Sequence, residues 1–163
     1  MARITVPEGD GGELIQVWSL SPELGAAVGA LSAAVYGDRL VPPRVREVAR
    51  MRIAQINGCN VCLAWRFPEM ADRGVTEALY EHVDDPDAGD YSTQERLAIE
   101  YAEKFALDHR SLDDEFFTRM RAEFNDAEIL ELTAMIGEWL AFGRLNAVLD
   151  VAEACAWAPS ATV

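Results

Sequence analysis

The chain has 163 residues, half of them apolar, and a formal net charge of −14. This length supports one domain with a real core, and the apolar content argues against a disordered chain. The negative charge argues against binding to nucleic acid or to anionic membranes, which attract clusters of Lys and Arg, although it would suit a basic protein partner.

Residues 1–20 are rich in proline and glycine, and we predict that they form an extended arm. The segment lacks the apolar run of a secretory signal, and no later apolar stretch is long enough to cross a bilayer. We therefore expect a cytoplasmic protein. The domain itself is expected over 21–158, followed by a short tail over 159–163.

Start and stop signals divide the domain into helices. Ser21 followed by proline predicts a helix that runs to Tyr36, and Pro43 predicts the start of the next one. The second helix should run through Ile56 and stop at Asn57-Gly58, because both residues tolerate a left-handed backbone. Further helices are expected from about Cys59 to a kink or end at Pro68, over 76–82, from Ser92 or Thr93 to Leu107, from Asp113 or Asp114 to about Phe124, and from Asn125 to about Gly143 with a bent continuation to Trp157.

Apolar residues at helical spacing predict which faces are buried. In the helix that follows Ser92, residues such as Leu97, Tyr101 and Leu107 should face inward, whereas the acidic loop over 84–90 should be solvated. The sequence has no alternating strand pattern of convincing length and no internal repeat. The predicted fold class is therefore a single all-α domain.

The densest concentration of chemistry lies at Cys59 and Cys62, which follow an Asn-Gly stop signal. Cysteines three residues apart on a helix have Cα atoms about 5–6 Å apart, close enough for a disulfide. At a helix start, unpaired N–H groups and the helix dipole favour the thiolate, which is the form that attacks a peroxide or a disulfide. In a cytoplasmic chain, this spacing indicates redox catalysis or metal binding.

Zinc is the weaker of these two interpretations, because a structural zinc site needs two further ligands. The remaining candidates, His82, His109 and Cys155, have no ligand-like spacing. We therefore predict neither a metal nor a cofactor. A third interpretation is that Cys59 and Cys62 are small buried residues without chemistry.

For the remaining aromatic, histidine and cysteine residues, we predict structural rather than catalytic positions. Trp18, Tyr36 and Trp65 could border a substrate pocket, but aromatic residues at such spacings usually pack in a core, and we predict core positions for them. His82 is expected at the surface, beside the acidic loop. Cys155 is expected to be buried or at an interface.

The stretch from Glu47 to Arg66 resembles the alkyl hydroperoxidase D-like branch of the carboxymuconolactone decarboxylase superfamily. That family has a glutamate, then a cysteine twelve positions later that opens a CxxC pair, then a histidine four residues after the pair. Here Glu47, Cys59 and Cys62 match this spacing, and a looser similarity extends from about Leu40 to Val151. The resemblance implies an all-α fold of about six to eight helices.

The resemblance also implies a thiol-dependent peroxidase or disulfide oxidoreductase. Cys62 would attack a hydroperoxide, Cys59 would close the disulfide, and Glu47 would be a relay carboxylate. The reductant would be a dithiol, such as a lipoyl group on a partner protein. Relatives form dimers, trimers or hexamers, so a homo-oligomer is expected.

Arg66 stands where the family has its relay histidine. Arginine cannot exchange a proton near neutral pH, because its pKa lies above about 12, but it can stabilise a thiolate or bind an anionic substrate. A water between Glu47 and Cys62 could carry the proton instead, unless Glu47 is simply paired with Arg44 or Arg50. Two other functions stay open: a lactone decarboxylase, which needs no CxxC pair, and a non-catalytic redox sensor or binding oligomer.

Overall fold

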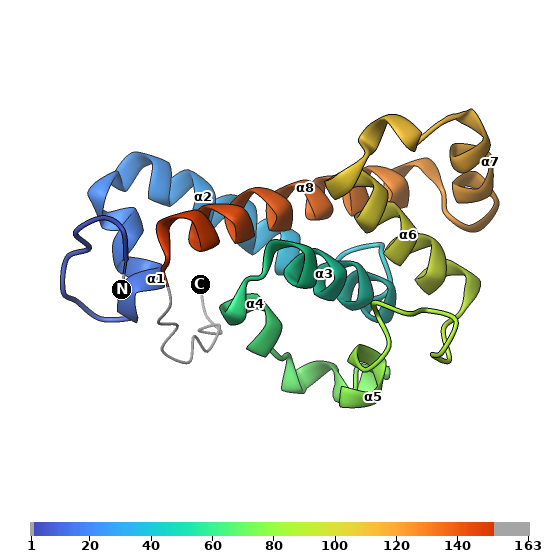
Figure 1. Ribbon diagram of the computed structural model, residues 1–163, viewed down its shortest axis with the longest axis horizontal. Coiled ribbons are helices and arrows are strands. Elements are labelled where there is room, and N and C mark those ends of the chain that lie inside the picture. Colours follow the sequence, from blue (N-terminus) through green and yellow to red (C-terminus); the bar gives the residue numbers. More distant parts are fainter. Residues whose placement is uncertain (1, 152–163) are drawn as a thin grey trace.

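The computed structural model describes residues 2–151, and within them the chain is all-α and without strands, which confirms the predicted fold class (Figure 1). Short 3₁₀ helices, labelled η, separate several of the α-helices. The elements in chain order are α1 Gly12–Gln16, η1 Val17–Leu20, α2 Pro22–Tyr36, α3 Pro43–Asn57, α4 Asn60–Ala64, η2 Pro68–Arg73, α5 Glu77–Tyr80, α6 Thr93–Leu107, η3 His109–Ser111, α7 Asp114–Glu123 and α8 Asp126–Leu149.

Several helix boundaries follow the capping signals of the sequence. Ser92 and Asn125 begin α6 and α8, each with a capping box in which the cap side chain and a glutamate three residues later satisfy each other's backbone N–H groups. Of the two candidates before α7, Asp113 is the cap. α3 ends at Gly58, whose φ of 61° lies in the left-handed region. Local chemistry therefore fixes where these helices start and stop.

The core forms where α3 lies against α6 and α8 (Figure 1). α3 is buried over most of its length and carries three buried charged residues, Arg46, Glu47 and Arg50. The long helix α8 contacts α2 near one end of the molecule and α7 near the other. In the described part of the chain, no helix has the length and apolar character that would let it span a membrane.

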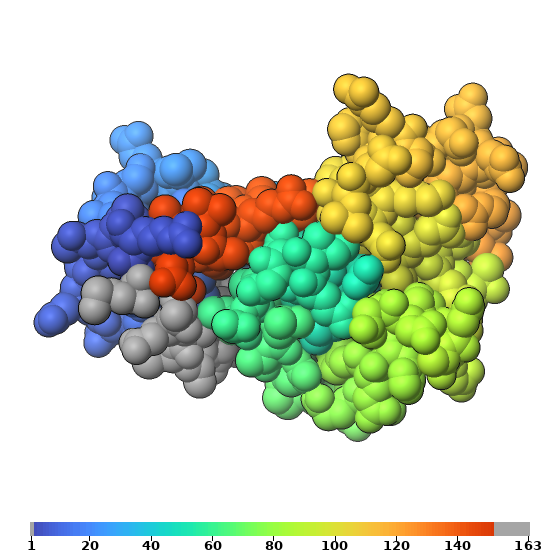
Figure 2. All heavy atoms as spheres, viewed as in Figure 1, coloured from blue at the N-terminus to red at the C-terminus, as the bar shows by residue number. Residues whose placement is uncertain are grey.

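The N-terminal helices form a layer over the C-terminal half of α8, seen at one end of the molecule in Figure 2. α2 is built almost entirely from small and apolar residues, yet Val35 is the one residue of this helix that is buried. Its main contacts are with α8 and η1 rather than with α3. This layer is therefore packed less closely than the core around α3.

Some expectations for these helices are wrong. Residues 12–20 form α1 and η1 instead of an extended arm, because only the glycines at the start of this stretch need an irregular backbone. Leu107 ends α6 beyond the core and is 63% exposed, although we expected it to face inward. α8 continues through Gly143 to Leu149 as one uninterrupted helix. The predicted domain boundaries stay predictions, and Cys155, Trp157 and the tail over 159–163 lie outside the described residues.

Candidate active site

Cys59 precedes α4 as its N-cap residue, and Cys62 lies in the first turn of this helix. Both are free thiols. The Sγ of Cys59 accepts a hydrogen bond from the backbone N–H of Cys62 at 3.4 Å. Cys59 is buried, with 3% of its surface exposed, whereas Cys62 is half-buried. The Asn-Gly stop and the CxxC spacing therefore hold the two sulfurs next to each other at a helix start.

The two thiols differ in acidity. A hydrogen bond between the two side chains lowers the pKa of Cys59 to about 7; backbone N–H groups add to this effect, and burial opposes it. The same side-chain hydrogen bond, together with burial, raises the pKa of Cys62. Near neutral pH the pair therefore holds one proton between two sulfurs, with the thiolate favoured on Cys59.

Cys62 lines a cavity of about 400 Å³, and Cys59 does not. The lining comes from α1, η1, α2, α3, α4 and α8 and from Trp65. The cavity walls are mostly apolar, and five aromatic side chains contribute to them: Trp18, Tyr36, Trp65, Trp139 and Phe142. Tyr36 and Trp65 pack against the core as predicted, and they also border the cavity. The core position predicted for Trp18 is wrong, since Trp18 lies outside the core cluster and packs edge-on against Phe142. A volume of this size suits a small organic molecule.

Glu138 of α8 lines the same cavity as Cys62, although only 7% of it is exposed. Its Oε1 accepts a hydrogen bond from Ser32 Oγ at 2.7 Å, and Ser32 is its sole hydrogen-bond partner within residues 2–151. Burial raises the pKa of Glu138, and the Ser32 hydrogen bond offsets only part of this effect. Burial and the nearby Glu138 also raise the pKa of Tyr36. The cavity therefore contains a carboxyl group that favours its protonated form.

Glu47 of α3 is fully buried and is not among the described residues that line the cavity. Its Oε2 accepts hydrogen bonds from Arg50 Nε at 2.8 Å and from the Tyr80 hydroxyl at 3.1 Å. Its Oε1 lies 3.7 Å from Arg46 Nε. Of the two pairings that the sequence left open, the structure shows Arg50, whereas Arg44 pairs with Glu95.

Arg50 connects Glu47 to the backbone of the thiol turn. Beyond its ion pair, it donates to the carbonyl oxygen of Cys62 at 2.7 Å and to that of Trp65 at 3.3 Å. Arg50 also lines the cavity, and its positive charge favours the thiolate form of both cysteines, although the pKa of Cys62 stays raised by its hydrogen bond to Cys59 and by burial. Arg50 therefore connects α3 to the backbone of the thiol turn and also supplies a positive charge near the thiols.

Arg66, which replaces the family histidine, contacts the backbone after the thiol pair and the side chain of Glu77. Its Nη1 donates to the carbonyl oxygens of Leu63 and Trp65 at 2.7 and 2.8 Å. Its guanidinium pairs with Glu77 of α5, with Nε–Oε1 and Nη2–Oε2 distances of 2.6 and 3.0 Å. It also lies over the ring of Tyr80, 4.5 Å from the centroid. Arg66 does not belong to the described lining of the cavity.

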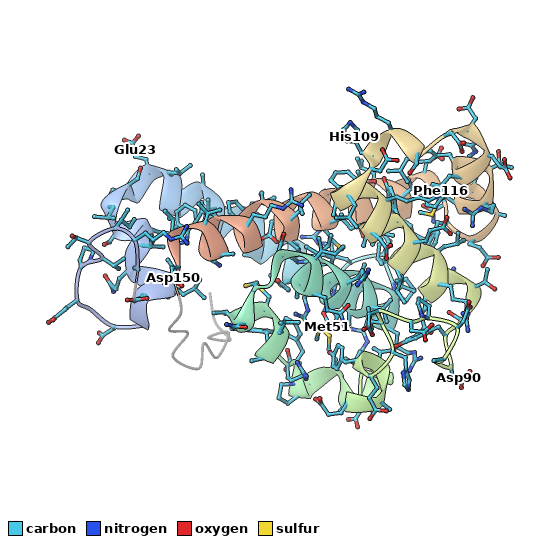
Figure 3. All side chains as sticks on the ribbon, viewed as in Figure 1. Glu23, Met51, Asp90, His109, Phe116 and Asp150 are labelled. Carbon is cyan, nitrogen blue, oxygen red and sulfur yellow. The ribbon has the colours of Figure 1, made fainter. Side chains whose placement is uncertain are left out.

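Both imidazoles lie apart from the thiols. His82 and His109 are exposed, and neither lines the cavity in the part of the chain that the structure describes. His109 projects outward from the surface near α6 and α7 (Figure 3). Across residues 2–151, no group of three His, Cys, Asp or Glu residues could hold a metal ion.

The polar cavity residues that sequence reasoning missed include Glu138 and Asn146. Glu138 interrupts the apolar run from Leu132 to Phe142, and a lone charge inside such a run is the signal that could have identified it. Asn146, two turns later on α8, lines the cavity with an Oδ1 atom that is buried and has no hydrogen-bond partner among the described residues. A polar atom left in this way is available to a ligand.

Comparison with known sequences relates the chain to one family. The model of the carboxymuconolactone decarboxylase family matches residues 22–103. The uncharacterized protein YnjA of Escherichia coli K12 is 34% identical over 110 residues, which cover 67% of this chain and 60% of YnjA. The uncharacterized protein YdfG of Bacillus subtilis is 25% identical over 103 residues, which cover 62% of this chain and 70% of YdfG. The match thus spans less than two thirds of YnjA.

Solved structures show the same fold. A putative antioxidant defence protein AhpD of unknown function from Agrobacterium tumefaciens, ATU0492, has a TM-score of 0.71 at 26% identity, covering 92% of this chain and 96% of that one. A peroxidase-related protein from Silicibacter sp. TM1040 has a TM-score of 0.73 at 18% identity, covering 88% and 76%. The debrominase Bmp8, as a cysteine-to-alanine variant in complex with 2,3,4-tribromopyrrole, has a TM-score of 0.74 at 19% identity, covering 96% and 95%. At below 25% identity, the last two establish the fold alone.

Proposed function

The chain belongs to the alkyl hydroperoxidase D-like branch of the carboxymuconolactone decarboxylase family, and from this we propose that it is a thiol-dependent peroxidase. The observation that carries the proposal is the unequal placement of the two thiols. Cys62 faces a cavity of substrate size, while the adjacent Cys59 is buried and holds the more acidic thiol.

The first step of the proposed reaction activates Cys62. The Cys59 thiolate takes the Cys62 proton across the hydrogen bond between the two side chains. The Cys62 sulfur then attacks the terminal oxygen of a hydroperoxide ROOH, so that an S–O bond forms and the O–O bond breaks. Cys62 becomes a sulfenic acid, and the departing alkoxide RO⁻ must be protonated to give the alcohol.

The second step closes the disulfide. The Cys59 sulfur attacks the sulfenic sulfur of Cys62, and the hydroxyl group leaves as water with the Cys59 proton. The adjacent positions of the two residues, on one turn of α4, suit this step. An external dithiol must then reduce the disulfide by thiol–disulfide exchange, and we propose a dithiol of the lipoyl type for this role.

We also retain the expectation of a homo-oligomer. It is supported by the large apolar side chains that α2 leaves exposed, including Leu24 at 55% and Leu31 at 44%. Where exposed apolar side chains are neighbours on a surface, they can mark a site of association. A second copy of the chain would cover it.

The test is hydroperoxide consumption by the full chain, with cumene hydroperoxide as oxidant and dihydrolipoamide as reductant. Cys62→Ser should abolish turnover. Cys59→Ser removes the base that activates Cys62, so it should slow the first oxidation and stop the cycle after it, leaving a sulfenic acid that dimedone traps on Cys62. Cys155→Ser is the matched control, since it removes the third thiol, and it should retain wild-type turnover. Absence of turnover in the wild type, with both thiols titratable, would contradict the peroxidase and favour the redox sensor.

A further inference from the structure

Peroxide reduction at Cys62 requires a proton donor beside the departing oxygen. Glu47, the relay carboxylate that the family resemblance implies, does not line the cavity in the described structure and is bound by Arg50 and Tyr80. Both histidines are exposed and do not line the cavity either. The polar residues that do line it include Ser32, Arg50 and Glu138. Of these three side chains, only a carboxyl group can give up a proton readily near neutral pH.

We propose that Glu138 is the proton donor of this site, and that it protonates the alkoxide oxygen that leaves when Cys62 attacks a bulky, uncharged organic hydroperoxide held in the cavity. This inference rests on the proposed peroxidase function. It assigns a catalytic role to a residue outside the family motif of Glu47 and the CxxC pair.

The surroundings of Glu138 suit a proton donor. Ser32 engages Oε1, so that Oε2 can carry the proton toward the cavity. The other titratable or charged groups that line the cavity are Tyr36 of α2, Arg50 of α3 and Cys62 of α4. Arg50 is already paired with Glu47, so no free cation of the described lining holds Glu138 in its ionised form. Burial favours the protonated carboxyl.

The cavity walls indicate the class of hydroperoxide. Aromatic and aliphatic side chains make most of the lining. Such a lining favours the binding of an apolar aryl or alkyl group and contributes little to the binding of hydrogen peroxide. An anionic substrate would lose its hydration beside Glu138 and gain no unpaired cation in return, which is costly. An uncharged organic hydroperoxide therefore fits best.

The protons and electrons of the cycle balance with Glu138 included. The resting site holds one thiolate, one thiol and the Glu138 proton. Glu138 gives its proton to the alkoxide, and the remaining thiol proton leaves in water when the disulfide forms. The dithiol reductant supplies the two electrons that open the disulfide, and its two protons restore one thiol and, through solvent, the Glu138 carboxyl group.

The decisive experiment compares two oxidants whose leaving groups differ in basicity and therefore in their need for a proton. Pre-reduced wild-type protein and Glu138→Gln are each mixed with cumene hydroperoxide, whose leaving alkoxide is strongly basic, or with perbenzoic acid, whose leaving carboxylate is weakly basic. We expect Glu138→Gln to slow thiol oxidation by cumene hydroperoxide by about 10²-fold. We expect it to slow the reaction with perbenzoic acid by less than about threefold, because benzoate leaves without a proton.

Two variants serve as controls. Glu131→Gln makes the same chemical change on α8 at a residue outside the cavity lining, and it should leave both rates at the wild-type level. Glu138→Asp keeps an acid and should recover part of the rate with cumene hydroperoxide but leave perbenzoic acid unaffected. Circular dichroism establishes that each variant is folded.

Equal slowing with both oxidants would overturn the inference, because it would show that Glu138 supports the site without donating a proton. An unchanged rate with cumene hydroperoxide would overturn it as well. The failure of the proposed function looks different, since wild-type protein would then show no oxidation that depends on Cys62 with either oxidant.

Discussion

Two buried glutamates lie close to the same pair of thiols, and the protein surrounds them in opposite ways. Glu47 on α3 is 0% exposed and has two arginines and the Tyr80 hydroxyl around its carboxylate. Glu138 on α8 is 7% exposed and has one serine. The same residue type thus lies in a buried ion pair in one place, whereas in the other it has no cationic partner among the described residues and burial raises its pKa. Partners, rather than burial alone, decide the role.

The packing around the two glutamates differs in the same direction. Glu47 is fully buried and bound by Arg50 of its own helix and by Tyr80 of α5, and Arg50 also anchors the backbone of Cys62. Glu138 faces a cavity roofed by α2, a helix with little buried surface. One region therefore fixes the positions of the thiols, and the other leaves room for a substrate beside them.

Of the predictions that follow from comparing the two glutamates, the largest effect is a loss of stability on substitution of Glu47. Glu47→Gln removes the counter-charge of Arg50 and Arg46, which are buried and would stay uncompensated. Breaking a buried pair by removing one partner costs about 3–5 kcal/mol, and we expect a loss of that order in the free energy of unfolding, measured by urea denaturation. Glu115→Gln, at an exposed site on α7, should change it little. A loss of under about 1 kcal/mol for Glu47→Gln would show that the pair is not a structural anchor.

Arg50→Lys should have the next largest effect. Lysine keeps the charge but cannot reach Glu47 and the carbonyls of Cys62 and Trp65 together, because it lacks the forked guanidinium. Losing hydrogen bonds to a charged group costs about 1–3 kcal/mol. The looser turn should also raise the pKa of Cys59 above its value of about 7, which the pH dependence of iodoacetamide labelling of the thiols would report. A labelling profile identical to that of the wild type would show that Arg50 does not tune the thiols.

At Glu138 the prediction concerns the pH dependence of stability. The pKa of Glu138 is raised in the folded chain, so as pH rises above about 4.3 the unfolded chain releases this proton first. Stability should therefore fall with rising pH until Glu138 ionises in the folded state. Glu138→Gln removes this term, so its free energy of unfolding relative to the wild type should increase between pH 4.5 and 8. A difference that stays constant over this range would contradict a neutral Glu138.

The fold followed from the sequence because its signals are local. Ser92, Asn125 and Gly58 set helix ends through bonds and backbone conformations within a few residues. The proximity of Cys59 and Cys62 is local for the same reason. Residues that share a cavity only after folding could not be predicted in this way, and Glu138 lies 76 positions from Cys62. A lone charge in an apolar helix marks such a residue but does not name its neighbours.

The smallest effect is predicted at Arg66, the position where the sequence departs from the family motif. Its guanidinium pairs with Glu77, which is 71% exposed, and exposed ion pairs contribute little. Arg66 lies outside the described cavity lining, so Arg66→Gln should leave the labelling of the thiols and the hydroperoxide rate within about twofold of the wild type. Glu77→Gln, which breaks the same pair from the other side, is the matched control. A large loss of rate in Arg66→Gln alone would bring Arg66 into the site and weaken the case for Glu138, because the proposed chemistry assigns the cation to Arg50 and the proton to Glu138.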